Sequence, residues 1–375
     1  MEHYLDNAAT TKVCNEAAQA ALDAMTSIYG NPGSTHTLGR AARALMDSSR
    51  KKVSCALGCS PSELVFTSCG SESDNWAIIS GAESMRRKGK HIISSETEHD
   101  AVRKSLDELE SRGFEVTRLK PDTTGAVSVE ALRNALRPDT VLVSLMTVNN
   151  ETGSVTDIAA AAEVIREAGS IALLHTDAVQ AFMKVPFKAS TLGADMISIS
   201  GHKIHAPKGI GALYIRKGLR IKPYITGGGQ EEGRRAGTEP VPQVAAFAAA
   251  CEAAAKDAAS VLRMTSFRSE IIERLSASVP GLSINGGGAP HILSISVPGM
   301  RSEVLMNFLE ARQIYVSKSS ACKRGGRSHV LEAMGIDPKR IDGAIRIGLS
   351  RYTTEDDIFA LCNGITDAWS TLAHS

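Results

Sequence analysis

Three clusters of polar side chains each follow a short apolar run of the chain. They are 149–153, 175–180 and 200–203. Taken singly, an Asp after a strand is usually a turn or helix-cap residue, and a Lys there is usually solvated. In an open parallel α/β sheet, however, ligands bind outside the carboxyl ends of the strands. Together the three clusters therefore predict one site that contains Asp177 and Lys203.

A fourth segment, Val65–Asn75, has the order strand, small residues and helix start. Free backbone N–H groups and the positive end of a helix dipole suit a phosphate group. An ordinary helix cap at Ser71 or Ser73 explains the same pattern, and the segment alone does not decide between the two. A dinucleotide site is less well supported, because Gly209–Gly211 lacks the third glycine and leads into a strand-like run instead of a helix.

An amine, a carboxylate and a phosphate cradle at neighbouring strand ends are what pyridoxal 5'-phosphate (PLP) requires. The amine of Lys203 binds the cofactor's aldehyde, and Asp177 keeps its ring nitrogen protonated. Ser200 and His202, close to the lysine in sequence, add two donors for the phosphate. These residues predict a PLP-dependent enzyme.

Alternating apolar runs and helix-like segments predict the fold that positions these residues. We expect strands at 62–67, 91–94, 140–146, 171–175, 196–200 and 209–215, and helices at 72–88, 100–112, 129–136 and 156–168. This alternation is typical of a mostly parallel sheet covered on both faces. The Ala-rich stretch 242–278 is expected to be one long helix leading into a smaller domain. We place the large domain at 13–257 and the small domain at 1–12 and 258–375.

The composition limits the classes of partner. The chain has 375 residues, a net charge of +1 and 4% aromatic residues, so it lacks the basic excess and stacking platforms of a nucleic-acid-binding protein. No apolar run reaches the about 18 residues of a membrane helix, and the start Met1–Asp6 does not resemble a signal peptide. We expect a cytoplasmic protein. The seven cysteines show no metal-site spacing, and we expect no metal centre.

Motifs along almost the whole chain resemble those of one enzyme family. Besides the three polar clusters, they are Tyr4–Thr11, Gly30–Pro32, Glu96–His99, Gly227–Glu231, Arg235–Thr238, Ser319–Cys322 and Ile345–Arg351. In this order they resemble the class V branch of fold-type I PLP enzymes, specifically the cysteine desulfurases of nitrogen fixation and iron–sulfur assembly. The resemblance implies an α/β fold with a large domain, whose mostly parallel seven-stranded sheet is sandwiched by helices, and a smaller α+β domain.

The resemblance also implies a role for each site residue. Lys203 would bind PLP covalently, and His99 would stack on the ring and act as acid and base. The implied cofactor-binding residues are Gly70, Ser71, His99, Asn150, Asp177, Gln180, Ser200, His202, Lys203 and, from the other subunit of a homodimer, Thr238. Asn31 and Arg346 would bind the substrate carboxylate, which a planar guanidinium matches with two hydrogen bonds.

The resemblance makes Cys322 the nucleophile that takes sulfur from L-cysteine, leaving L-alanine and a protein persulfide. Only a thiolate does this, and the small, polar, cationic segment 316–327 suits an accessible loop. Lys323 and Arg324 depart from the small residues usual after this cysteine in the family. We expect these cations to lower the pKa of Cys322 and to favour an acidic acceptor surface. The implied acceptor is an iron–sulfur scaffold protein or a tRNA-thiolation enzyme.

Two other functions stay open at the level of sequence. The chain would be another class V enzyme, an aminotransferase or a selenocysteine lyase, if Cys322 has no part in the reaction. It would be a non-enzymatic assembly scaffold if it forms no alanine from L-cysteine. The presence of both Lys203 and Cys322 argues against the scaffold.

Overall fold

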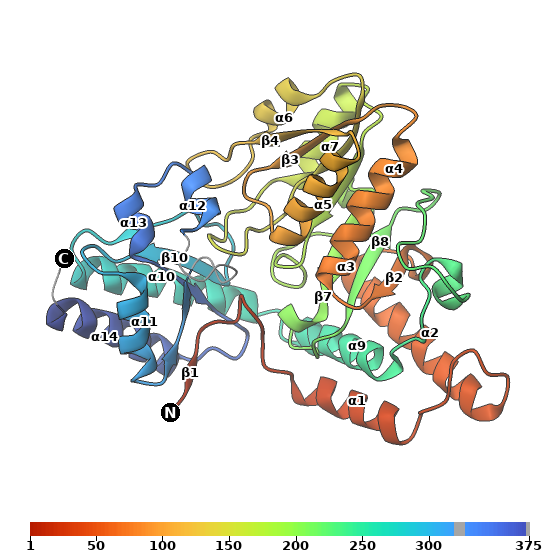
Figure 1. The fold of residues 1–375 in the computed structure, drawn as a ribbon. Helices are drawn as coiled ribbons and strands as arrows, with labels where there is room; N and C mark the ends of the chain where they lie inside the picture. The colour runs from red at the N-terminus through yellow and green to blue at the C-terminus, as the bar shows by residue number, and fades with distance from the viewer. Residues whose placement is uncertain (319–326, 373–375) are drawn as a thin grey trace.

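A seven-stranded sheet forms the centre of the larger part of the molecule (Figure 1). The computed structural model describes residues 1–318 and 327–372. In spatial order the strands are β2 (Leu64–Thr67), β8 (Gly211–Ile215), β7 (Met196–Ser200), β6 (Leu173–Asp177), β5 (Thr140–Ser144), β3 (His91–Ser95) and β4 (Glu115–Leu119). Only β8 runs against the others of this sheet. The prediction of a mostly parallel seven-stranded sheet is confirmed.

Successive side chains of the central strands enter two different hydrophobic cores. Ile92 and Leu142 pack in one core, whereas the next residues, Ile93 and Val143, pack in the other. A strand with both faces buried is apolar at successive positions. For this reason the strands appear in the sequence as continuous apolar runs.

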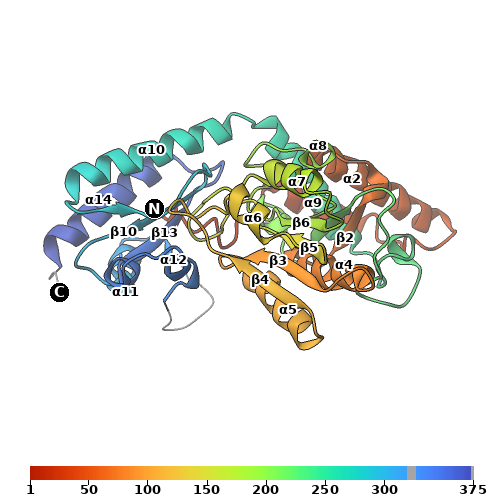
Figure 2. The same ribbon diagram turned by 90° about the horizontal axis from the view of Figure 1, so that it is seen from above.

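Helices cover both faces of this sheet (Figure 2). One core contains side chains of α1 (Asn15–Thr26), α2 (Thr37–Leu57), α6 (Val129–Ala135), α7 (Ile158–Glu167), α8 (Ala189–Leu192) and α9 (Val241–Lys256). The opposite core contains side chains of α4 (Gly81–Met85), α5 (Asp100–Ser111) and the π-helical turn Trp76–Ser80, which joins α3 (Gly70–Asn75) to α4. Within residues 1–318 and 327–372, no helix combines the length and apolarity needed to span a membrane.

A second, four-stranded sheet lies beside the first part (Figure 1). Its antiparallel strands, in order, are β12 (Ser317–Lys318), β13 (Ala344–Gly348), β10 (Ile292–Ser296) and β9 (Ser283–Ile284). The helices of this part are α10 (Ser260–Ser278), α11 (Ser302–Glu310), α12 (His329–Ala333), α13 (Pro338–Asp342) and α14 (Glu355–Thr371). The start of the chain joins this part, because β1 (His3–Tyr4) pairs with β11 (Ile314–Tyr315) and Leu5 is buried in its core.

One expectation about the elements was wrong, and one strand was missed. The stretch 242–278 is two helices, because α9 ends at Lys256 and α10 begins at Ser260. Asp257 interrupts the helix: its carboxylate pairs with Arg263 and its carbonyl oxygen accepts from Ser260 Oγ at 2.6 Å. Strand β4 was not predicted, because it is an edge strand with mostly exposed or half-buried residues instead of an apolar run. The division into domains at residues 13–257 stays a prediction.

Candidate active site

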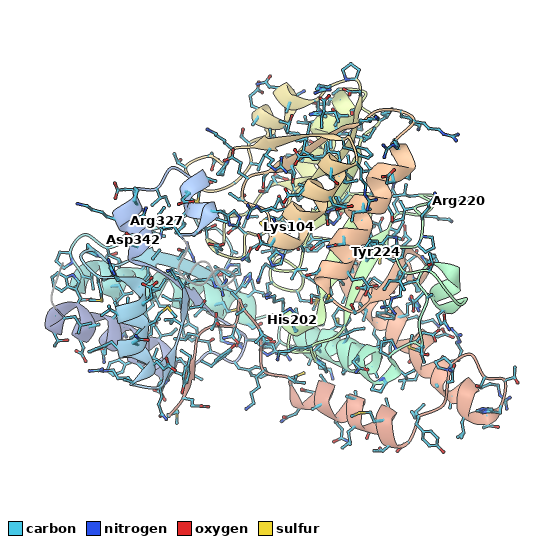
Figure 3. The ribbon with its side chains drawn as sticks, in the orientation of Figure 1. Lys104, His202, Arg220, Tyr224, Arg327 and Asp342 are labelled. Carbon is cyan, nitrogen blue, oxygen red and sulfur yellow. The ribbon has the colours of Figure 1, made fainter. Side chains whose placement is uncertain are left out.

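A cavity of about 320 Å³ opens at the carboxyl ends of β5, β6 and β7. In agreement with the argument from strand ends, residues of all three polar clusters line it. The predicted site residues on its wall are Gly70, Ser71, His99, Asn150, Asp177, Gln180, Ser200, His202, Lys203 and Arg346. In Figure 3, His202 lies between the part of the molecule that contains the seven-stranded sheet and the part that contains the four-stranded sheet. The roles assigned to these residues stay predictions.

Three predicted site residues are not part of this cavity wall. Asn31 is exposed, and its Oδ1 accepts a hydrogen bond from Gly33 N at 2.8 Å. Thr238 is exposed on the segment that precedes α9. Cys322 lies outside the described residues, as do Lys323 and Arg324.

Lys203 ends a single 3₁₀ turn, Gly201–Lys203, that directly follows β7. Its Nζ donates to Ala8 O and Ala9 O, both at 2.7 Å. The N-terminal segment therefore lies beside the turn that follows β7 and contributes Ala8 and Ala9 to the cavity wall. Because this turn begins directly after the last residue of β7, the position of the strand in the sheet determines where the amine of Lys203 lies in the cavity.

Asp177 is the last residue of β6 and is buried. Its Oδ1 accepts from Val179 N at 2.9 Å. Burial raises the pKa of Asp177, whereas the hydrogen bond from Val179 N and the charge of Lys203 act in the opposite direction. Both interactions favour the ionised form of the carboxylate.

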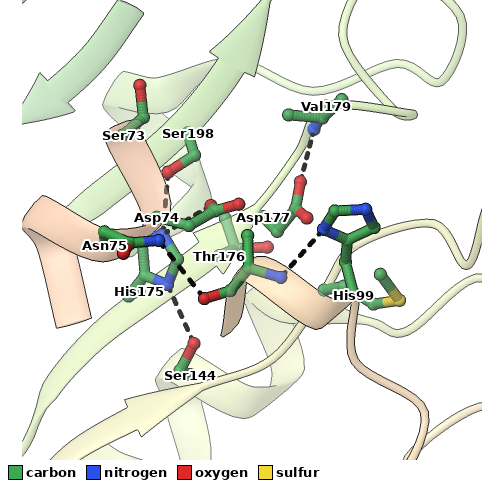
Figure 4. Close-up of polar contacts among 12 residues, drawn as sticks. Ser73, Asp74, Asn75, His99, Ser144, His175, Thr176, Asp177, Val179 and Ser198 are labelled. Atoms are coloured by element: carbon green, nitrogen blue, oxygen red, sulfur yellow. Dashed lines mark hydrogen bonds and ion pairs between the residues drawn. The ribbon is translucent and has the colours of Figure 1, made fainter. Parts of the chain in front are cut away.

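A buried polar network lies behind Asp177 (Figure 4). His175 Nδ1 is 2.8 Å from Ser144 Oγ, and His175 Nε2 is 3.0 Å from Ser198 Oγ. Burial lowers the pKa of His175 to about 3, so its ring is neutral. Burial and the charge of Asp177 raise the pKa of Asp74 well above its usual value. We assign the proton to Asp74, because the charge of Lys203 favours the ionised form of Asp177 and because Asp74 Oδ1 has no hydrogen-bond partner among the described residues.

The neutral His175 predicts a specific dependence of stability on pH. The folded pKa lies below the unfolded value of 6.5, so the unfolded chain binds the proton first and stability falls as the pH decreases from about 6.5 toward 3. At pH 5 this group costs about 2 kcal/mol. We expect His175→Gln to be less stable at pH 7 but to lose about 2 kcal/mol less between pH 7 and pH 5, as measured by urea unfolding. Equal losses in both proteins would contradict this account.

His99 is the N-cap of α5. Its Nδ1 accepts from Ala101 N at 3.1 Å. In the neutral ring the proton is therefore on Nε2. The cap fixes the orientation of the ring at the cavity wall and leaves Nε2 free of this backbone contact.

Glu98, next to His99, joins two strand ends. Its Oε1 accepts from Ser95 Oγ at 2.8 Å and from Met146 N at 2.9 Å. Burial raises its pKa to about 8. Its carbonyl oxygen lies 3.2 Å from His329 Nε2, at the start of α12. The motif 96–99 thus links the wall of the cavity to the second part of the molecule.

Arg346 reaches the cavity from β13 of the smaller sheet. It is buried; Nη1 donates to Asn150 O at 2.8 Å and Nη2 pairs with Asp6 Oδ1 at 3.0 Å. Nε has no partner among the described residues. The cavity is therefore walled by both sheets, and the N-terminal segment orients the guanidinium.

Four buried polar atoms of residues on the cavity wall lack a hydrogen-bond partner among residues 1–318 and 327–372. Besides Asp74 Oδ1 and Arg346 Nε, they are Ser200 Oγ and Gln180 Oε1. Gly70 lies close to Ser200, and a Cβ at position 70 would lie 2.7 Å from Val179 Cγ2, so that Val179 would have to shift. Unpaired buried groups of this kind are costly unless a ligand or water satisfies them. The wall is thus suited to a polar ligand near the start of α3.

Asp74, Met146 and Val179 also line the cavity, although the sequence analysis assigned no role to any of them. A signal for Asp74 was present: it lies three and seven residues before Ala77 and Gly81, on the helix face that packs against the sheet. A carboxylate on an apolar helix face is unusual and marks a functional or networked group. In the described part of the chain, no group of three or more His, Cys, Asp or Glu side chains is placed to hold a metal ion.

Comparisons with known proteins extend over nearly the whole chain. Residues 3–361 match the family described as Aminotransferase class-V. The cysteine desulfurase IscS of Methanosarcina thermophila is 42% identical over 361 residues, which are 95% of this chain and 89% of the relative.

Solved structures are similar as well. One described as a NifS-like protein has a TM-score of 0.94 and 38% identity, covering 99% of this chain and 100% of the other. One described as SspA in complex with cysteine has a TM-score of 0.82 and 32% identity, with coverage of 94% and 100%. The fold is therefore shared along with the sequence.

Proposed function

The chain belongs to the aminotransferase class-V family, and on that premise we propose that it is a cysteine desulfurase, which releases L-alanine from L-cysteine and passes the sulfur to an acceptor. The observation that carries the proposal is the meeting of Lys203, Asp177 and Arg346 in one cavity. These side chains supply an amine, a buried carboxylate and a carboxylate-binding guanidinium. An amino-acid substrate needs the last of these.

The cavity wall fits PLP. Ser200 Oγ is one of the atoms left for a ligand, and the start of α3 at Gly70 and Ser71 offers donors for a phosphate, together with His202. Asp177 would hold the ring nitrogen, and Lys203 would hold the aldehyde carbon. Asn150 and Gln180 would bond the ring hydroxyl. When bound, the cofactor supplies an electron-accepting ring that weakens bonds at the amino-acid Cα.

The chain's own residues bind the substrate and move its protons. Arg346 would hold the carboxylate, and its contacts with Asn150 O and Asp6 orient the guanidinium. Asn31 stays part of this proposal, although its side chain is outside the cavity wall. Lys203 Nζ and His99 Nε2 are the basic atoms we assign to proton transfer at Cα.

We assign the sulfur-accepting step to Cys322, which lies outside the described residues. Its thiolate would attack the substrate sulfur, forming an S–S bond. The electron pair of the broken C–S bond would stay with the carbon fragment, which gains a proton at Cβ and leaves as alanine. The acceptor of the persulfide sulfur would be an iron–sulfur scaffold protein or a tRNA-thiolation enzyme, with Lys323 and Arg324 favouring an acidic surface.

We further propose a cytoplasmic homodimer in which Thr238 completes the phosphate site of the partner subunit. The loop that carries Thr238 is held on its own chain by two partly buried ion pairs. Glu231 pairs with Arg50 at 2.7 Å, and Glu72 pairs with Arg235 at 2.9 Å. These contacts hold the loop in place and leave Thr238 exposed. A residue that contacts a second copy of the chain must be exposed in the single chain.

The function is tested by incubating the PLP-loaded protein with L-cysteine and a thiol reductant. We expect alanine and sulfide in equal amounts. An oxo acid without sulfide would indicate an aminotransferase. Release of selenium from selenocysteine with no reaction of cysteine would indicate a lyase, and no product from either would indicate a scaffold. Each of these three results would overturn the proposal.

Replacing Arg346 with lysine is expected to raise KM for L-cysteine by roughly 10–150-fold, with a smaller change in kcat. The reason is that lysine cannot make the two parallel hydrogen bonds to a carboxylate, and a hydrogen bond to a charged group contributes about 1.5–3 kcal/mol. Steady-state kinetics measures the effect. Arg301→Lys, an exposed position of the same part of the molecule, should leave KM unchanged. An unchanged KM in Arg346→Lys would remove this residue from the substrate site.

A further inference from the structure

Glu151 connects the loop that follows β5 to the start of α12. Its Oε2 accepts a hydrogen bond from Ser328 Oγ at 2.5 Å. Both side chains are buried, with 5% of Glu151 and 2% of Ser328 exposed. Glu151 belongs to the polar cluster 149–153, whereas Ser328 belongs to the second part of the molecule. The roles assigned so far include neither residue.

The hydroxyl group of Ser328 has a partner on each side. Ser328 is the N-cap of α12, and its Oγ accepts from Leu331 N at 3.1 Å. Its own hydrogen is therefore left for Glu151. Burial raises the pKa of Glu151 to about 7, and the hydrogen bond from Ser328 is the largest interaction that opposes this effect. The carboxylate thus holds the cap residue of α12 from outside the helix.

The residues on either side of this hydrogen bond join the same two parts of the molecule. Asn150, which lines the main cavity, accepts from Arg346 Nη1 through its carbonyl oxygen. His329 Nε2 lies 3.2 Å from Glu98 O. The short loop after β5 is therefore connected both to the guanidinium in the cavity and, through Glu151, to the start of α12.

The position of Ser328 limits where the thiol of Cys322 can lie. Cys322 is six positions before Ser328 and four positions after Lys318. A chain extends by at most about 3.6 Å per residue, so the Cα of Cys322 is within about 22 Å of that of Ser328 and about 14 Å of that of Lys318. Lys318 is held by the pairing of β12 with β13, opposite Ile345. Ser328 is the second fixed point, and Glu151 is the side chain that holds it beside the cavity.

We propose that Glu151 is a positioning residue for the sulfur-accepting step, and that it acts by holding Ser328 in place relative to the main cavity. This inference rests on the proposed function, because it concerns the step that we assign to Cys322. A displacement of about 1 Å in a reacting group can cost about 10²-fold in rate. Loss of the hydrogen bond should therefore slow sulfur transfer while leaving the binding of L-cysteine unchanged.

Glu151→Ala in the PLP-loaded protein separates these two effects. The single-turnover rate of persulfide formation from L-cysteine should fall by about 10–100-fold. The Kd for L-cysteine, measured from the cofactor absorbance in a Cys322→Ala background, should change by less than about two-fold when Glu151→Ala is added. The reason is that Arg346 bonds the backbone carbonyl of Asn150, which the substitution keeps. Glu151→Gln should retain at least about a third of the wild-type rate, because its amide oxygen accepts the same hydrogen bond.

Ser328→Gly removes the same hydrogen bond from its other end, and glycine is well tolerated at an N-cap. It should lower the rate as much as Glu151→Ala does, and the two substitutions together should lower it no further. This variant gives the same comparison if Glu151→Ala does not fold. Glu303→Ala is the matched control, because it removes the exposed partner of Lys318 at the other fixed point. Exposed ion pairs contribute little, so this variant should keep the wild-type rate.

Two results would overturn the inference alone. One is a rate in Glu151→Ala or Ser328→Gly equal to that of Glu303→Ala. The other is an increase in the Kd for L-cysteine that accounts for the whole loss of activity. In both cases the wild type forms alanine, and the proposed function stands. A wild type that forms no alanine from L-cysteine would overturn the proposed function and this inference together.

Discussion

Replacing Lys203 with alanine is expected to lower alanine formation from L-cysteine by at least about a thousand-fold. Lys203 supplies the one amine on the described wall of the main cavity. It has two tasks in the proposed function, since it holds the cofactor and moves a proton. Proton transfer by a positioned side chain alone contributes about 10²–10⁴-fold. The measurement is single-turnover formation of alanine, together with the visible absorbance of the protein-bound cofactor.

Two further variants identify the cause of the loss. Lys203→Arg keeps the positive charge and the contact with the N-terminal segment but cannot bond covalently to an aldehyde, so it should be as inactive as Lys203→Ala. Lys208→Ala removes an exposed lysine five residues further along the same loop and should keep full activity. If Lys203→Ala retained more than a tenth of the rate, Lys203 would not be the cofactor lysine and the proposed function would fail.

The strand ends of the large sheet could be predicted from the sequence for a physical reason. Parallel strands buried on both faces appear in the sequence as apolar runs. The polar residues at their carboxyl ends lie together, because the carboxyl ends of parallel strands are at the same edge of the sheet. Asp177 and Lys203 therefore meet although 26 positions separate them. Arg346 could be included only through the resemblance, because nothing local shows that β13 of another sheet reaches this edge.

Other features depend on tertiary packing and left little trace in the sequence. His175 and Asp177 are two positions apart on β6 and so point to the same face, yet Asp177 borders the cavity while His175 is enclosed by Ser144 and Ser198. Single residues after strands were predictable, whereas the buried electrostatics behind them were not.

The second large effect is expected at Cys322. Cys322→Ala should lower desulfuration of L-cysteine by at least about a hundred-fold, because the thiolate that attacks the substrate sulfur would be missing. Cofactor binding should be unchanged, since no cofactor contact is assigned to this residue. After incubation of the wild type with L-cysteine, mass spectrometry of the Cys322 peptide should show the gain of one sulfur atom.

Cys69 is the matched control, because its position alone makes it the rival nucleophile. It is half-buried and lines the main cavity, whereas Cys322 is placed at the reaction only by resemblance. A thiol beside the start of α3 would face the proposed phosphate site, not the substrate sulfur, so Cys69→Ala should keep at least about half of the wild-type rate. The opposite pattern, with an active Cys322→Ala and an inactive Cys69→Ala, would identify Cys69 on the cavity wall as the cysteine that forms the persulfide. It would also mean that Cys322 does not carry the sulfur to the acceptor.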